Sequence, residues 1–292
     1  MNMNNRPNFF ILGAAHAGTT SFNNYLKSNP EVFASSIKEP NFFSPTINKL
    51  HIGLSSETPN FSLDEYLSLF SSVKNEKIIC DASTRYLYDS QTPKLIHEFN
   101  PDSKFLVILR DPIERIQTHL HAYYGYVSPS EIKSIVNEGI EEFYNQITKP
   151  NLLNMGCYSK HLSNFFNFFD RNRFVITYFE NVFPQNVVKT VKDVLDMFDV
   201  RLHDFSIIAS NVYYERPKGI VKKLFKNKAS QKFLQKANLE KPFVDYYKKF
   251  NTNKKKPELS SEVFDTLKEF YSEQNKELEK LIGLKPPWKN FT

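Results

Sequence analysis

The sequence predicts an α/β fold in which a central parallel β-sheet is flanked by helices in three layers. Two observations predict it. Short apolar runs alternate with segments of helical periodicity from residue 9 to residue 198. One run, KFLVILRD at 104–111, is continuously apolar at its centre, as expected for a strand buried on both faces of a parallel sheet. Ligands of such sheets bind at the carboxyl ends of the strands.

The elements follow in order along the chain. A strand at 9–12 (FFIL) ends at a glycine, and a helix is predicted within 19–30, where Phe22, Tyr25 and Leu26 are spaced to share one face. Further strands are predicted at 77–83, 104–111 and 173–180. Further helices are predicted at 93–100, 114–125, 158–169 and 187–198. Strands joined by helices in this way form βαβ units.

After these units the pattern changes to a lysine-rich segment at 218–256, where apolar residues recur every four positions from Val221 to Phe233. This predicts a basic amphipathic helix. It either packs on the domain with a solvated lysine face or contacts an acidic polymer or a membrane surface. A second amphipathic helix is predicted at 260–282. Because no repeat or low-complexity linker divides the chain, we expect one domain over 1–292.

Composition limits the class of protein. The 292 residues are 40% hydrophobic, 15% aromatic and 24% charged, which indicates a folded chain rather than a disordered one. Two cysteines, Cys80 and Cys157, are too few for a disulfide framework or a cysteine metal cluster. No apolar stretch reaches the roughly 20 residues of a membrane span, and the amino terminus lacks a signal-peptide pattern, so we expect a cytoplasmic protein. The net charge of +6 favours an anionic partner.

The stretch GAAHAGTT at 13–20 has the spacing of a phosphate-binding loop. Backbone N–H groups in such a turn, together with the dipole of the following helix, bind anions. The spacing matches the P-loop G-x-x-x-x-G-K-[ST], except that Thr19 replaces the lysine. Helix capping alone would explain the hydroxyls but not the two glycines before them. We therefore predict a P-loop-like anion site that does not hydrolyse ATP or GTP.

A metal is not expected at this site. Asp111 ends a predicted strand, but it is followed by proline and flanked by arginines, unlike the metal-binding aspartate of P-loop enzymes.

Six stretches occur in the order in which one known family carries its motifs. They are GAAHAGTTSFNNYLKSNPEVF (13–33), KEPNFF (38–43), VILRDPIERIQTHLHAYY (107–124), GCYSKHLSNFFNFF (156–169), RFVITYFENV (173–182) and a carboxyl-terminal helix with a tryptophan ending (257–288). Together they resemble the sulfotransferases that use 3′-phosphoadenosine 5′-phosphosulfate (PAPS), especially the bacterial and heparan-sulfate-type branch. The first resembles the 5′-phosphosulfate loop of that family, and the third resembles its 3′-phosphate motif.

The resemblance implies PAPS as co-substrate, no metal, and a set of donor-binding residues. The 5′-phosphosulfate would lie on Gly13, His16, Ala17, Gly18, Thr19, Thr20 and Ser21. Arg110 and Thr118 would hold the 3′-phosphate, for which a guanidinium fork and a hydroxyl are suitable groups. Lys254, Lys255 and Lys256 fall where heparan-type members have a basic loop over the nucleotide, although a solvated lysine run explains them equally well.

Catalysis requires a base, because the acceptor hydroxyl loses a proton as sulfur arrives. The resemblance gives this role to Glu39, with Asp81 as the second choice. His16 departs from the family, which has lysine or arginine there to stabilise the oxygen that leaves sulfur. An imidazole with a pKa near ~6.5 is mostly neutral at pH 7 unless a bound anion raises that pKa. We therefore expect a slower or acid-shifted sulfotransferase.

The expected acceptor is a hydroxyl or amine of a glycan or glycolipid, and no nucleic acid partner is expected. The segments expected to shape its pocket, 44–66 and 119–156, are irregular or tyrosine-rich and carry no motif. The alternatives are a PAPS-binding protein of the same fold that has lost catalysis, a P-loop kinase or triphosphatase, and a nucleic-acid-binding module. The absent loop lysine argues against the kinase, and no nucleic-acid motif accompanies the basic residues.

Overall fold

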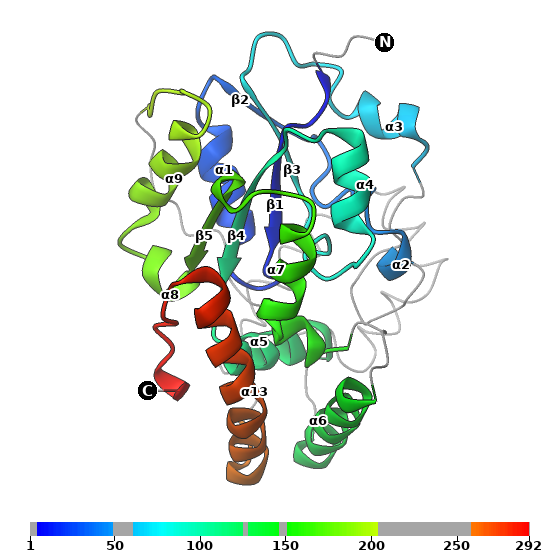
Figure 1. Cartoon of the computed structure of the whole chain (residues 1–292), viewed down its shortest axis with the longest axis vertical. Helices are drawn as coiled ribbons and strands as arrows, with labels where there is room; N and C mark the ends of the chain where they lie inside the picture. Colours follow the sequence, from blue (N-terminus) through cyan, green and yellow to red (C-terminus); the bar gives the residue numbers. More distant parts are fainter. Residues whose placement is uncertain (1–4, 49–60, 125–127, 146–150, 204–257, 292) are drawn as a thin grey trace, which may run out of the picture.

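The computed structural model describes residues 5–48, 61–124, 128–145, 151–203 and 258–291, and its centre is a parallel β-sheet (Figure 1). The sheet has five strands in the order β2-β3-β1-β4-β5, and every neighbouring pair is parallel. The strands are β1 (Phe9–Gly13), β2 (Val32–Ala34), β3 (Ile78–Ala82), β4 (Lys104–Leu109) and β5 (Phe174–Tyr178). The four predicted strands and the parallel sheet are confirmed. The edge strand β2 was not predicted, because three residues are too few for a pattern.

The predicted helices are also present. They are α1 (Thr19–Lys27), α4 (Thr92–Phe99), α5 (Pro112–Tyr124), α7 (Tyr158–Phe166), α9 (Val187–Asp196) and α13 (Ser261–Ile282). The structure adds α2 (Pro45–Asn48), α3 (Leu63–Ser68), α6 (Pro129–Tyr144) and α8 (Phe179–Val182). Three 3-10 turns lie at Asn154–Gly156, Arg171–Arg173 and Lys289–Phe291.

Helix α6 corrects the expectation that 119–156 is irregular or tyrosine-rich and carries no motif. A capping box begins it: the Glu131 backbone N–H donates to Ser128 Oγ at 3.3 Å, and the Ser128 N–H donates to the Glu131 carboxylate at 2.8 Å. These bonds satisfy donors that a helix start leaves open. Ile132 and Val136 bury its inner face. The S-x-x-E spacing at 128–131 was the signal that predicts this start.

The two faces of the sheet carry different helices. Phe105 on β4 packs against Phe165 of α7 at a ring-centroid distance of 5.7 Å. Phe99 of α4 reaches the same face through Phe43, which contacts Phe10 of β1 at 6.0 Å, beside Phe105. On the other face Phe9 of β1 contacts Phe198, just beyond α9, at 5.8 Å. Successive strand residues point to opposite faces, so the apolar runs supply both layers. The result is the expected three-layer arrangement, with helices on both faces of the sheet.

A second apolar cluster lies beyond the carboxyl ends of the strands, where α5 crosses below the sheet (Figure 1). Ile116 of α5, Leu153 and Leu267 of α13 are fully buried in it. The hydroxyl of Tyr271 donates to the carbonyl of Leu153 at 2.7 Å. This packing fixes α5 against the edge of the sheet where ligands of parallel sheets bind.

The predicted basic segment 218–256 lies outside the described residues. Within the described part of the chain, no helix is both long and apolar enough to cross a membrane.

A buried carboxylate anchors the strand β3. Asp81 is 0% exposed and accepts hydrogen bonds from the hydroxyls of Tyr66 and Tyr86, both at 2.8 Å, and of Ser83 at 2.7 Å. Burial raises the pKa of Asp81 to about 6. Three hydroxyl donors satisfy the oxygen atoms that burial would otherwise leave without water. Asp81 therefore ties α3 and the segment after β3 to the core.

Replacing Asp81 by alanine is expected to destabilise the fold by about 3 kcal/mol, because several buried hydroxyls lose their acceptor at once. Urea unfolding at neutral pH measures this change. Asp102→Ala is the matched control: its carboxylate is 85% exposed and pairs with Arg173, so its loss changes stability by less than about 1 kcal/mol. Equal effects of the two substitutions would contradict the structural role of Asp81.

Candidate active site

The loop between β1 and α1 has the geometry of an anion site. Gly18 is the N-cap of α1, with a φ of 77° in the left-handed region that favours glycine. The loop is tied on both sides, since the Ala14 N–H donates to the Ile108 carbonyl at 2.7 Å and the Ala15 N–H donates to the Tyr88 hydroxyl at 2.8 Å. The first turn of α1 then presents its N–H groups and its dipole at this loop.

The predicted donor-loop residues lie together in this turn. Gly13 ends β1, Ala17 is fully buried, and Thr19 and Ser21 are buried in the first turn of α1, while Thr20 is half-buried. The structure thus brings the hydroxyls to the amino-terminal end of one helix, as the spacing predicted.

His16 lies at the tip of the loop with a φ of 64°. Its ring meets that of His119 edge-on at a centroid distance of 5.1 Å. Burial, together with the charges of Arg115, Arg110 and Lys38, lowers the pKa of His16 to about 3. The imidazole is therefore neutral at pH 7, and three cations already surround it.

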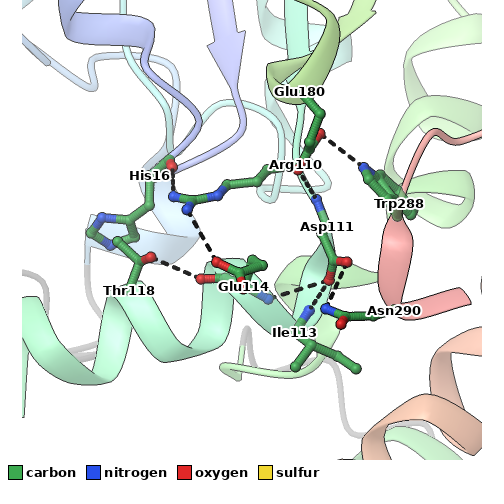
Figure 2. Close-up of polar contacts among 9 residues, drawn as sticks. All are labelled: His16, Arg110, Asp111, Ile113, Glu114, Thr118, Glu180, Trp288 and Asn290. Atoms are coloured by element: carbon green, nitrogen blue, oxygen red, sulfur yellow. Dashed lines mark hydrogen bonds and ion pairs between the residues drawn. The ribbon is translucent and has the colours of Figure 1, made fainter. Parts of the chain in front are cut away.

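Arg110 joins this loop to the end of β4 (Figure 2). One guanidinium nitrogen, Nη1, donates to the His16 carbonyl at 2.7 Å, and Nη2 lies 3.5 Å from a carboxylate oxygen of Glu114. The guanidinium also lies 4.7 Å from the ring centroid of Phe179. Its Nε is buried and has no hydrogen-bond partner among the described residues. A buried donor of this kind suits an anionic oxygen.

Thr118 is buried two turns along α5 from Arg110, and its hydroxyl donates to the Glu114 carbonyl at 2.8 Å. Arg110, Glu114 and Thr118 therefore form one group at the start of α5, beside the loop of β1 (Figure 2). The hydroxyl oxygen keeps acceptor capacity in this bond, and its proton can turn to a bound anion.

A partly buried network fixes the start of α5. Asp111 accepts from the backbone N–H groups of Ile113 at 2.9 Å and Glu114 at 3.2 Å, and from the Asn290 side chain at 2.9 Å. Glu180 accepts from the Asp111 N–H and from Trp288 Nε1, both at 3.1 Å (Figure 2). Sequence reasoning considered Asp111 only as a metal ligand and missed this network, because its partners lie up to 179 positions apart. The tryptophan ending was the only sequence signal for them.

Glu39 and Lys38 lie on the β3 side of the loop, whereas Arg110 follows β4 on its other side. The Glu39 N–H donates to the Ala82 carbonyl at 3.2 Å, which docks this segment on the carboxyl end of β3. The Glu39 carboxylate accepts from the Thr84 hydroxyl at 3.3 Å and lies 3.4 Å from Lys38 Nζ. Lys38 Nζ in turn donates to the Thr20 hydroxyl at 2.5 Å. A half-buried carboxylate and an ammonium group thus stand beside the first turn of α1.

The other predicted residues lie elsewhere. Asp81 points into the core, where its three hydroxyl donors hold it. Arg115, which is not among the predicted site residues, has a fully buried guanidinium that donates to the carbonyl of Leu152. Lys254, Lys255 and Lys256 lie outside the described residues. Within the described ranges, no group of three or more histidine, cysteine or acidic side chains is arranged to hold a metal ion.

The parallel sheet, the glycine-bounded loop and the helix that follows define a P-loop-like α/β protein. A family model described as "Sulfotransferase domain" matches residues 6–281, so the chain belongs to the sulfotransferase family. This confirms the resemblance read from the motifs.

Individual relatives agree with the family. Human carbohydrate sulfotransferase 15 is 26% identical over 249 residues, which cover 66% of this chain and 44% of the relative. Human heparan sulfate glucosamine 3-O-sulfotransferase 3B1 is 23% identical over 286 residues, covering 95% of this chain and 63% of the relative. The chain thus spans less than half the length of carbohydrate sulfotransferase 15. A solved sulfotransferase from Alicyclobacillus acidocaldarius shares the fold, with a TM-score of 0.66 at 23% identity and coverage of 95% and 96% of the two chains.

Gly18→Ala is expected to destabilise the loop for two reasons. Alanine disfavours a φ of 77°, and its Cβ would lie 2.5 Å from Cε2 of Phe183. We expect Gly18→Ala to lower the free energy of unfolding by about 2–4 kcal/mol, measured by urea unfolding.

Gly283→Ala isolates the effect of the positive φ from that of the contact with Phe183. Gly283 has a similar φ of 69° but open space around its Cβ position. Gly283→Ala should lower the free energy of unfolding by only about 1 kcal/mol. A Phe183→Leu change should recover part of the Gly18→Ala loss. Equal losses at the two glycines would argue against the close packing of the loop on Phe183.

Proposed function

We propose that this enzyme transfers the sulfuryl group of PAPS to a hydroxyl or amine of an acceptor, with a glycan or glycolipid as the acceptor class. The observation that carries the proposal is the contact of Arg110 with the His16 carbonyl at 2.7 Å, which unites the loop of β1 with the start of α5. A donor with phosphate groups at both its 5′ and 3′ positions needs two anion sites side by side. The loop would hold the 5′-phosphosulfate, and Arg110 and Thr118 would hold the 3′-phosphate.

The chemistry of the step is an in-line displacement at sulfur. A bond forms between the acceptor oxygen and sulfur, and the bond from sulfur to the bridging phosphate oxygen breaks. The electron pair of that bond stays on the 5′-phosphate of the product, 3′-phosphoadenosine 5′-phosphate (PAP). By analogy with phosphoryl transfer, catalysis consists mainly of positioning and of stabilising the departing charge.

Glu39 is the base that this site supports best. Its side chain is 31% exposed, so an acceptor can reach it, whereas Asp81 is 0% exposed and accepts hydrogen bonds from three hydroxyl groups. The Thr84 hydroxyl orients one of the Glu39 carboxylate oxygens at 3.3 Å. The second oxygen can accept the acceptor proton as the bond to sulfur forms.

The names of the relatives support a carbohydrate acceptor, since carbohydrate sulfotransferase 15 and a heparan sulfate glucosamine 3-O-sulfotransferase are among them. The neutral His16 favours one second candidate, a PAPS-binding protein of the same fold with impaired catalysis.

Sulfuryl transfer from ³⁵S-labelled PAPS tests the function directly. The purified chain is incubated with a panel of glycans, glycolipids, small alcohols and amines, and labelled product is separated by chromatography. We expect label on at least one carbohydrate. Tight binding of PAP with no labelled acceptor in any class would favour the impaired protein instead.

Glu39→Gln should lower the rate of this transfer by about 10²-fold or more, because the acceptor proton loses its base. The affinity for PAP, measured by calorimetry, should stay nearly unchanged. Glu98→Gln is the matched control, since Glu98 is 60% exposed on α4 and pairs with Lys94 at 3.8 Å. Full activity of Glu39→Gln would assign the base elsewhere.

A further inference from the structure

The site has an ammonium group that the loop motif does not include. In a P-loop the cation comes from within the loop, but here Thr19 and His16 occupy the candidate positions. His16 is neutral at pH 7, because burial and neighbouring cations oppose its protonation. A neutral imidazole can donate one hydrogen bond, but it brings no positive charge to a departing phosphate.

Lys38 brings a positive charge to the same place from another part of the chain. It follows β2, and its Nζ lies 2.5 Å from the Thr20 hydroxyl in the first turn of α1. The same Nζ lies 3.4 Å from Glu39 Oε1. The ammonium group therefore stands between the amino-terminal end of α1, where the donor would bind, and the carboxylate proposed as the base.

The backbone around Lys38 is held while its side chain keeps freedom. Glu39 and Asn41 have φ values of 56° and 53°, in the left-handed region. The Glu39 N–H bonds to the Ala82 carbonyl, and the Asn41 N–H donates to the Ser83 hydroxyl at 3.1 Å. The Lys38 side chain is 41% exposed, so it can turn from Thr20 to a bound anion without leaving the site. A lysine ammonium has three donors on a flexible stem, which suits this movement.

We propose that Lys38 is the cation of the transfer step and that its Nζ contacts the bridging oxygen as the sulfur–oxygen bond breaks. This inference rests on the proposed function. The electron pair that returns to the 5′-phosphate is then stabilised by an ammonium supplied from the segment after β2 instead of from the loop. The Glu39 contact lets one residue pair serve both ends of the reaction, with Glu39 at the incoming oxygen and Lys38 at the departing one.

The test compares Lys38→Met with Lys94→Met, since Lys94 is also an exposed lysine paired with a glutamate. Both variants are measured for PAP affinity by calorimetry and for transfer of labelled sulfuryl groups from pH 6 to pH 9. Lys38→Met should lower kcat by about 10²-fold or more at every pH, the usual effect of removing one charge-stabilising donor. Its PAP affinity should fall by no more than about tenfold, and Lys94→Met should match the wild type.

A second variant moves the charge back into the loop. His16→Lys combined with Lys38→Met should transfer at least about tenfold faster than Lys38→Met alone, because the lysine again faces the departing oxygen.

Two results would overturn the role of Lys38. One is a kcat of Lys38→Met equal to that of Lys94→Met. The other is a loss that disappears at high pH, which would mean that Lys38 acts only by keeping Glu39 ionised. Failure of the wild-type chain to bind PAP or to transfer label would instead contradict the proposed function itself, so the two failures are distinguishable.

Discussion

The hydrogen bond from Arg110 to the His16 carbonyl is the interaction on which the rest of the site depends. It joins the loop after β1 to the end of β4, two neighbouring strands whose carboxyl ends meet at the same edge of the sheet. The Arg110 backbone is itself held, because Tyr158 donates to its carbonyl at 2.8 Å. A planar guanidinium can bond the loop with one nitrogen and leave others for an anion. One side chain therefore holds together the two segments that we propose as anion sites.

The carboxyl-terminal segment holds this arrangement in place. Trp288 and Asn290 reach back to Glu180 and Asp111, which follow the neighbouring strands β5 and β4. Burial raises the pKa of Asp111 to about 6, so a carboxylate that caps α5 is held with little water around it. Its backbone and amide donors offset that loss of hydration. The start of α5, which lies between Arg110 and Thr118, is thus fixed by Glu180 and by the carboxyl-terminal residues Trp288 and Asn290.

The sequence allowed much of the fold to be predicted, because buried strands and amphipathic helices leave periodic patterns. The edge strand β2 was too short for such a pattern, and α6 was missed although its S-x-x-E start is visible at 128–131. The resemblance assigned the loop and Arg110 to one nucleotide, and both follow strands of one parallel sheet, whose carboxyl ends bind ligands. The pKa of His16 could not be predicted, because it depends on burial and on Arg115, Arg110 and Lys38 around it. Lys38 lies in the stretch KEPNFF but was not predicted as a site residue, because its contact with Thr20 is made only by folding.

The central claim is that two adjacent anion sites, the loop of β1 and the Arg110–Thr118 pair, are matched to a nucleotide with phosphates at both 5′ and 3′ positions. Calorimetric titration with PAP and with 5′-AMP measures this claim most directly, since the two ligands differ only in the 3′-phosphate. The account predicts that PAP binds at least about 100-fold more tightly, as expected for a phosphate held by charge-assisted hydrogen bonds in a partly buried site. Equal affinities for the two nucleotides would contradict it.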